Sequence, residues 1–188
     1  MLPLKIIQCP KHRKIKRKLL AEIDNADSYQ IDHEGDEGIG PVTDWTTDCR
    51  EEREEYMRVY MMHAEQAILD VCRYEYGFED GNIGHYWFQQ YEETYTHSWH
   101  FHGGCLYHAI YYLELPEDAP PTMCRLPGGF EFTPNAKEGD ILIMPSIVEH
   151  CSPPNRSEER KTIIAVNIDE WFLYNRYIAW NRLKNFLK

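Results

Sequence analysis

The segment Ser98-Trp-His100-Phe-His102 decides how this chain is interpreted. In an extended strand, side chains two residues apart point to the same face, so His100 and His102 can aim two imidazoles at one point. A third histidine, His150, follows 48 residues after His102. We therefore predict a metal site with three histidine ligands.

The position of His150 follows from the segment that precedes it. Gly139-Asp140 marks a turn, residues 141–144 (Ile-Leu-Ile-Met) have the composition of a buried strand, and Pro145 ends that strand. His150 is then expected at the rim. Three protein ligands on one side leave positions open on the other, which is typical of non-haem iron sites that bind an organic co-substrate together with O2.

A candidate carboxylate-binding pair follows ten residues later. Arg160 offers a planar fork that can form two parallel hydrogen bonds to a carboxylate, and Thr162 on the same strand face can add a hydroxyl group.

These segments resemble the Fe(II)/2-oxoglutarate-dependent oxygenases, particularly the compact versions common in bacterial viruses and bacteria. The resemblance covers roughly residues 82–168, and its segments are 87–102, 110–116, 139–146, His150 and 160–167. It implies a double-stranded β-helix with the metal in its open mouth. It also implies Fe(II), 2-oxoglutarate and O2 as reactants, and hydroxylation of an unknown substrate.

The resemblance also implies residue roles. His100 matches the first metal ligand and His150 the distal histidine, while His102 occupies the place where the family has Asp. An imidazole in place of a carboxylate favours metals that prefer nitrogen, so we expect Ni, Cu and Zn to compete with Fe(II). Ni, Zn or Mn are the expected substitutes for Fe(II) in the site. Arg160 and Thr162 match the residues that bind the far carboxylate of 2-oxoglutarate.

Two further residues are candidate contacts of the co-substrate. Tyr91 belongs to a strand face with Trp87 and Gln89, where a core role is equally consistent with the pattern. Asn167 follows Arg160 on the same predicted strand. We expect His97 and His108 to be packed or surface histidines, because His97 lies one place off the His100/His102 face and His108 lies inside a strand.

Two other functions fit part of the pattern. Cupins also combine His-x-His with a later Gly-Asp-x4-Pro-x4-His, which predicts a thiol dioxygenase or a metal-dependent sugar-binding or isomerase protein. Cupins usually add a Glu soon after the pair, and residues 103–108 contain none. A closed structural zinc site is the third interpretation, and it lacks a fourth ligand.

The order of elements predicts the fold. Polar and Gly-rich residues 27–48 indicate a long loop, and helices are expected at 11–25 and 50–76. Seven strand-like segments follow, with bounds 85–91, 97–102, 106–115, 122–125, 130–133, 140–144 and 161–167, after a first strand at 4–8. A closing helix is expected at 169–188. We predict one α+β domain over residues 1–188, with a helical part to about residue 80, a cupin-like jelly-roll core at about 82–168 and helices bracing it.

Composition sets the broad class. The 188 residues are 43% hydrophobic and contain no apolar run near the ~18 residues that a membrane helix needs, so we expect a soluble protein without a membrane partner. Six scattered cysteines without C-x-x-C spacing indicate free thiols and a reducing compartment, and no export signal is visible, which predicts a cytoplasmic protein, in the host cytoplasm if viral.

Charge is distributed unevenly along the chain. The net charge is −11, yet residues 1–20 carry seven basic side chains and no acid. A basic helix of this kind can bind nucleic acid or an acidic partner. We favour a solvated helix face packed on an acidic domain, because the rest of the surface repels phosphate.

Overall fold

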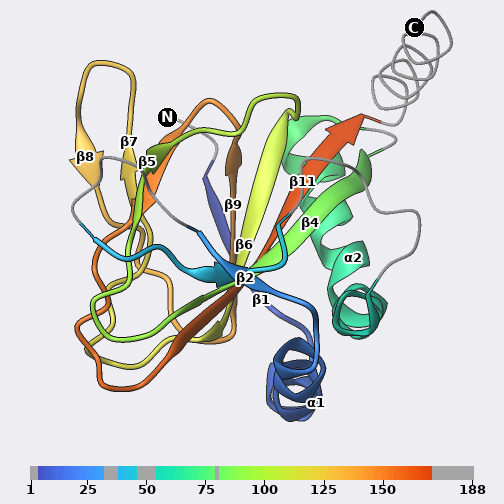
Figure 1. Cartoon of the computed structure of the whole chain (residues 1–188). Helices are drawn as coiled ribbons and strands as arrows, with labels where there is room; N and C mark the ends of the chain where they lie inside the picture. The colour runs from blue at the N-terminus through green and yellow to red at the C-terminus, as the bar shows by residue number, and fades with distance from the viewer. Residues whose placement is uncertain (1–3, 32–37, 46–53, 79–80, 171–188) are drawn as a thin grey trace, which may run out of the picture.

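The computed structural model describes residues 4–31, 38–45, 54–78 and 81–170. Two antiparallel sheets form its centre, and the helices α1 and α2 lie beside the larger sheet (Figure 1). The helices span α1 (His12–Asp24) and α2 (Glu55–Tyr76). The predicted α+β jelly roll is confirmed by this arrangement.

The larger sheet has seven strands. Their spatial order is β1 (Lys5–Gln8), β9 (Asp140–Pro145), β6 (Tyr107–Glu114), β11 (Lys161–Glu170), β4 (Gly81–Tyr91), β3 (Val42–Thr43) and β2 (Tyr29–Gln30). The smaller sheet contains β5 (His97–His100), β10 (Glu149–Ser152), β7 (Met123–Arg125) and β8 (Glu131–Phe132), in that order. The crossovers between the sheets bring distant parts of the chain to one open end.

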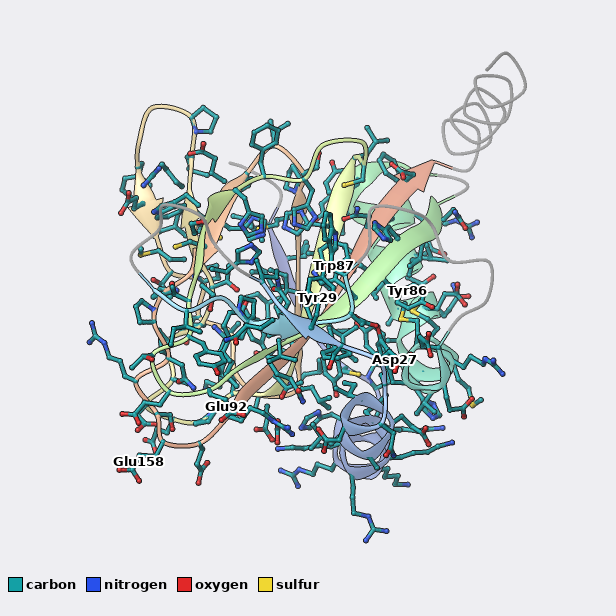
Figure 2. All side chains as sticks on the ribbon, viewed as in Figure 1. Asp27, Tyr29, Tyr86, Trp87, Glu92 and Glu158 are labelled. Atoms are coloured by element: carbon teal, nitrogen blue, oxygen red, sulfur yellow. The ribbon has the colours of Figure 1, made fainter. Side chains whose placement is uncertain are left out.

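Alternation along the central strands separates two cores. On β4, Tyr86 lies towards α2 whereas Trp87 lies towards the space between the sheets (Figure 2). The same alternation on β11 places Ile164, Val166 and Ile168 in the core beneath the helices, and Ile163 in a second core between the sheets. Because strand side chains have a period of two, neighbouring residues of one strand serve different cores.

The long helix α2 packs through the stripe that its sequence predicts. Tyr56, Tyr60, Ile68 and Cys72 are almost completely buried against the large sheet. Tyr60 stacks on Tyr111 of β6 with ring centroids 4.9 Å apart. The helix ends where Gly77 adopts a left-handed conformation, with φ of 78°, that glycine reaches without steric cost.

The basic helix α1 lies on the acidic domain. Ile15, Leu19 and Ile23 are buried, and Lys16 and Lys18 form ion pairs with Glu138 and Glu55 at 2.7 and 3.3 Å. Lys16 and Lys18 therefore fit the packed helix face that we favoured. Contact with nucleic acid remains the alternative that we did not favour.

Two sequence expectations need correction. The segment 27–48 is not loop throughout, because β2 and β3 lie within it and β3 pairs with Gln89 and Gln90 of β4. Two-residue strands are too short to produce a periodic signal. The closing helix was expected from residue 169, but residues 169 and 170 belong to β11, and the remainder of that prediction lies outside the described residues. Within the described residues, no helix has the length and apolarity needed to cross a membrane.

Candidate metal centre and adjoining cavities

The structure brings His100, His102 and His150 together at the open end of the two sheets. His100 ends β5 and is the direct cross-strand partner of His150 on β10. His102 lies two residues beyond the end of β5, where its backbone N–H donates to the carbonyl oxygen of Ser146 at 3.1 Å. One ring nitrogen from each histidine lies within 4.8 Å of the others, so the three could hold one metal ion.

The hydrogen bonds of these histidines direct the same nitrogen of each ring to the centre. Nδ1 of His100 lies 2.7 Å from the carbonyl oxygen of Ser98, and Nδ1 of His150 lies 3.2 Å from that of Val148. Nδ1 of His102 lies 2.8 Å from Oδ1 of Asn167. Because an oxygen of this kind only accepts, each Nδ1 must carry the proton. Nε2 is therefore the lone-pair nitrogen in all three rings, which is the state a metal requires.

Burial keeps the rings of His102 and His150 neutral. Desolvation lowers the pKa of His102 to about 4, although the hydrogen bond to Asn167 acts in the opposite direction. Burial holds the pKa of His150 well below its usual range. A neutral imidazole has no proton to lose before it binds a metal ion.

Two further histidines, His97 and His108, lie beside the three, although we expected both to be packed or surface histidines. His97 stacks on His100 with ring centroids 4.1 Å apart, and its Nδ1 lies 3.0 Å from Nε2 of Gln89. His108 on β6 is fully buried and lies 4.2 Å from the His102 ring and 4.6 Å from the His150 ring. Among the described residues, neither ring nitrogen of His108 has a hydrogen-bond partner.

The predicted carboxylate-binding pair lies away from the histidines: Arg160 immediately precedes β11, and Thr162 is on the strand face opposite Lys161. Nε and Nη1 of Arg160 donate to Glu114 and Asp24 at 3.1 and 2.9 Å, and the Thr162 hydroxyl also donates to Glu114. Neither residue lines a cavity at the histidines. The spacing pointed to Arg160, but the alternation of the strand turns its side chain towards α1.

The cation that faces the histidine side is Lys161, which the sequence reasoning missed. Its side chain is 1% exposed, and Nζ donates to the carbonyl oxygen of Pro120 at 2.8 Å and to Oγ of Ser152 at 2.9 Å. No carboxylate pairs with it among the residues that the structure describes. Burial lowers the pKa of Lys161 to about 7. An ammonium group buried without an anion is costly, so this arrangement favours a negatively charged ligand beside it.

Tyr91 and Asn167 both lie on the histidine side. The Tyr91 ring is 5.1 Å from Nζ of Lys161, and its hydroxyl donates to Oε1 of Gln89 at 2.7 Å. Asn167 lies opposite His108 in the register of β11 and β6, and it accepts the hydrogen bond from His102. Asn167 thus positions a histidine, whereas Tyr91 lies beside the buried cation.

Two cavities meet at the histidines. The inner one, of about 20 Å³, has room for a water molecule and extends from His100, His102 and His150 to Lys161. The outer one, of about 520 Å³, opens to solvent. Five side chains line both cavities and form the partition between them: Trp87, Gln89, His97, His100 and His102.

Comparisons with known proteins identify the fold. A scan against protein-family models and a search of curated protein sequences give no match. Among solved structures, a prolyl-4-hydroxylase from Pseudomonas putida superposes with a TM-score of 0.66 at 16% identity, over 90% of this chain and 94% of that one. An oxidoreductase of the 2OG-Fe(II) oxygenase family from Burkholderia pseudomallei gives a TM-score of 0.70 at 8% identity, over 88% and 84% of the two chains.

A third solved structure is a complex with 2-oxoglutarate. The viral collagen prolyl hydroxylase from Paramecium bursaria Chlorella virus-1 gives a TM-score of 0.58 at 13% identity, over 89% of this chain and 95% of that one. At these identities the likeness shows the fold, and the expected double-stranded β-helix is confirmed.

Proposed function

We propose that this protein is an Fe(II)- and 2-oxoglutarate-dependent oxygenase that hydroxylates a C–H bond of its substrate. The observation that carries the proposal is one pairing: three histidines that each place one ring nitrogen within 4.8 Å of the others, and a buried lysine that lines the same small cavity. The first binds a metal and the second attracts a carboxylate. The fold shared with solved 2-oxoglutarate oxygenases supports this combination.

His100, His102 and His150 would hold the metal, which supplies O2 activation and oxidative decarboxylation of 2-oxoglutarate when it is bound. Lys161 would pair with the far carboxylate of 2-oxoglutarate, with Ser152 and Tyr91 beside it. This role replaces the one that the sequence resemblance gave to Arg160. It also favours the oxygenase over a three-histidine cupin, because a metal centre alone gives no reason to bury Lys161.

The inner cavity is too small to hold 2-oxoglutarate as it stands. A volume of about 20 Å³ holds a water molecule but not a five-carbon diacid, so the partition must move when 2-oxoglutarate enters. Gln89 is the side chain best placed to do this, because its amide joins His97 to Tyr91 across both cavities. We infer that Gln89 turns away from the inner cavity as the diacid binds.

The test is an anaerobic titration of the Fe(II)-loaded protein with 2-oxoglutarate, monitored by the visible charge-transfer band of the chelate. Wild type should develop the band at saturation. Lys161→Met should need at least about tenfold more 2-oxoglutarate, since a charge-assisted hydrogen bond contributes roughly 1.5–3 kcal/mol. Arg160→Met is the matched control and should bind like wild type.

The two variants remove neighbouring cations on opposite sides of the sheet, and of these two only Lys161 lines the inner cavity among the described residues. If Fe(II)-loaded wild type binds no 2-oxoglutarate, the proposed function is wrong. If Arg160→Met weakens binding and Lys161→Met does not, the carboxylate site lies where the sequence resemblance first placed it.

A further inference from the structure

The outer cavity carries information about the substrate. We propose that it binds an organic cation, a molecule with an apolar or aromatic body and an ammonium group. The inference rests on the proposed function only in taking this cavity as the substrate site, because the same histidines line its floor.

Aromatic side chains line the cavity from its mouth to the histidines. Trp45 and His85 have ring centroids 6.5 Å apart, His85 and Trp87 5.5 Å, and Trp87 and His102 5.3 Å. Trp45 is 38% exposed and Phe101 61% exposed, although both line this cavity. Exposed indole and phenyl rings around a hollow offer flat apolar contact to a ligand, and their π faces attract cations.

Among the described residues, the charge that lines the cavity is negative. Apart from the histidines, Asp169 is the one ionisable side chain among the described residues that line it. Its Oδ1 accepts a hydrogen bond from the backbone N–H of Leu106 at 3.2 Å, and burial raises its pKa to about 6. A carboxylate that is partly desolvated without a cation beside it gains most from a cationic ligand.

The same features disfavour an anionic substrate. No lysine or arginine among the described residues lines the outer cavity, whereas the lysine of the inner cavity is enclosed behind Gln89. The net charge of −11 adds long-range repulsion for anions and attraction for cations. The two cavities therefore select opposite charges, a diacid inside and a cation outside.

The experiment compares three ligands that share a phenyl ring: benzyltrimethylammonium, benzyl alcohol and phenylacetate. Binding to the metal-free full-length protein at pH 8 is followed by tryptophan fluorescence, because Trp45 and Trp87 line the cavity. Benzyltrimethylammonium should bind at least about tenfold more tightly than benzyl alcohol, the ratio expected for a desolvated cation–π contact combined with a charge partner. Phenylacetate should bind most weakly.

Two variants locate the effect. Asp169→Asn keeps an acceptor for the Leu106 N–H and should remove most of the preference for the cation while leaving benzyl alcohol binding unchanged. Trp45→Leu should weaken the cation more than the alcohol. Glu158→Gln removes the same charge at an exposed position on the opposite end of the molecule and should change nothing (Figure 2).

Equal binding of the three ligands, tightest binding of phenylacetate, or no binding of the cation at millimolar concentration would overturn the inference. An effect of Glu158→Gln as large as that of Asp169→Asn would also overturn it, because the cation would then be attracted by the overall negative charge of the protein and not by Asp169. The assay needs neither metal nor 2-oxoglutarate, so its failure is distinct from failure of the charge-transfer titration.

Discussion

The two faces of β11 differ in what they do for the molecule. The face towards the helices carries Ile164, Val166 and Ile168, all buried in the larger apolar core. The opposite face carries Lys161 and Asn167, and it borders the histidines and both cavities. The even-numbered residues Ile164, Val166 and Ile168 thus pack beneath the helices, whereas the odd-numbered residues face the second core, the histidines and the cavities, and a one-residue error in the alignment exchanges the two faces.

The largest effect should come from the metal ligands. His100→Ala and His150→Ala should each lower metal affinity by more than about a hundredfold, because even loss of a residue supporting a ligand costs ten- to a hundredfold. Metal content after dialysis measures this. His63→Ala on α2 is the control for the helix face and should keep its metal. Full metal retention in His150→Ala would show that His150 is not a metal ligand.

The helix face should respond in stability instead. Ile164→Ala should lower the free energy of unfolding by roughly 2–5 kcal/mol, since Ile164 is completely buried. Ile147→Ala, at a position that is 65% exposed, should change it by no more than about 0.5 kcal/mol. Urea unfolding gives both values. The comparison between the faces would break if folded Ile164→Ala lost its metal as completely as the histidine variants.

Lys161 should make the free energy of unfolding depend on pH. Its pKa is about 7 in the folded chain and about 10.4 when unfolded, so between these values the unfolded chain binds more protons. The contribution of Lys161 to stability is therefore lowest below pH 7 and rises towards pH 10. Lys161→Met removes this term, so its stability relative to wild type should be roughly 2–3 kcal/mol more favourable at pH 6 than at pH 9.

Urea unfolding at the two pH values provides the measurement. Lys137→Met replaces an exposed lysine and should show no such difference. A relative stability of Lys161→Met that is the same at pH 6 and pH 9 would mean that the Lys161 ammonium is not buried in solution.

The smallest effect concerns Asn167. Asn167→Ala removes the acceptor for Nδ1 of His102 and should weaken metal binding by about tenfold, whereas Asn167→Asp keeps an acceptor and should restore it. Thr162→Val alters a polar side chain on the opposite face of the same strand and should leave metal affinity unchanged. Competition with a chelating dye measures all three. Equal affinities in Asn167→Ala and wild type would remove the positioning role.

Much of the fold was predictable because its signals are periodic. The stripe of α2 repeats over enough residues to identify the helix and its inner face, and the continuous apolar runs of β6 and β9 identify strands that are buried on both faces. The grouping of His100, His102 and His150 was predicted from the i, i+2 rule for a strand over residues 97–102, whereas β5 ends at His100 and His102 reaches the same place from beyond the strand. Two-residue strands and the extension of β11 to Glu170 have no such repeat, so they were missed.

The face of Lys161 was predictable in principle. Counting alternation along residues 161–167 would have placed it with Ile163 and Asn167, away from Thr162 and Ile164. The inward orientation of His108 could also have been predicted. His108 lies an even number of residues from Ile110 and Tyr112, which face the inner core. The stacking of His97 on His100 could not be predicted, because it depends on an irregular register where β5 meets β10.

The three histidines differ in how far along the chain their hydrogen-bond acceptors lie. His100 and His150 are each oriented by a carbonyl oxygen two residues earlier in their own segment, so pairing of β5 with β10 completes both. His102 is oriented by Asn167, a residue 65 positions away on the last strand. Two ligands are therefore set by local contacts and the third by a long-range one. A local opening of β11 would therefore release His102 from its acceptor while His100 and His150 keep theirs.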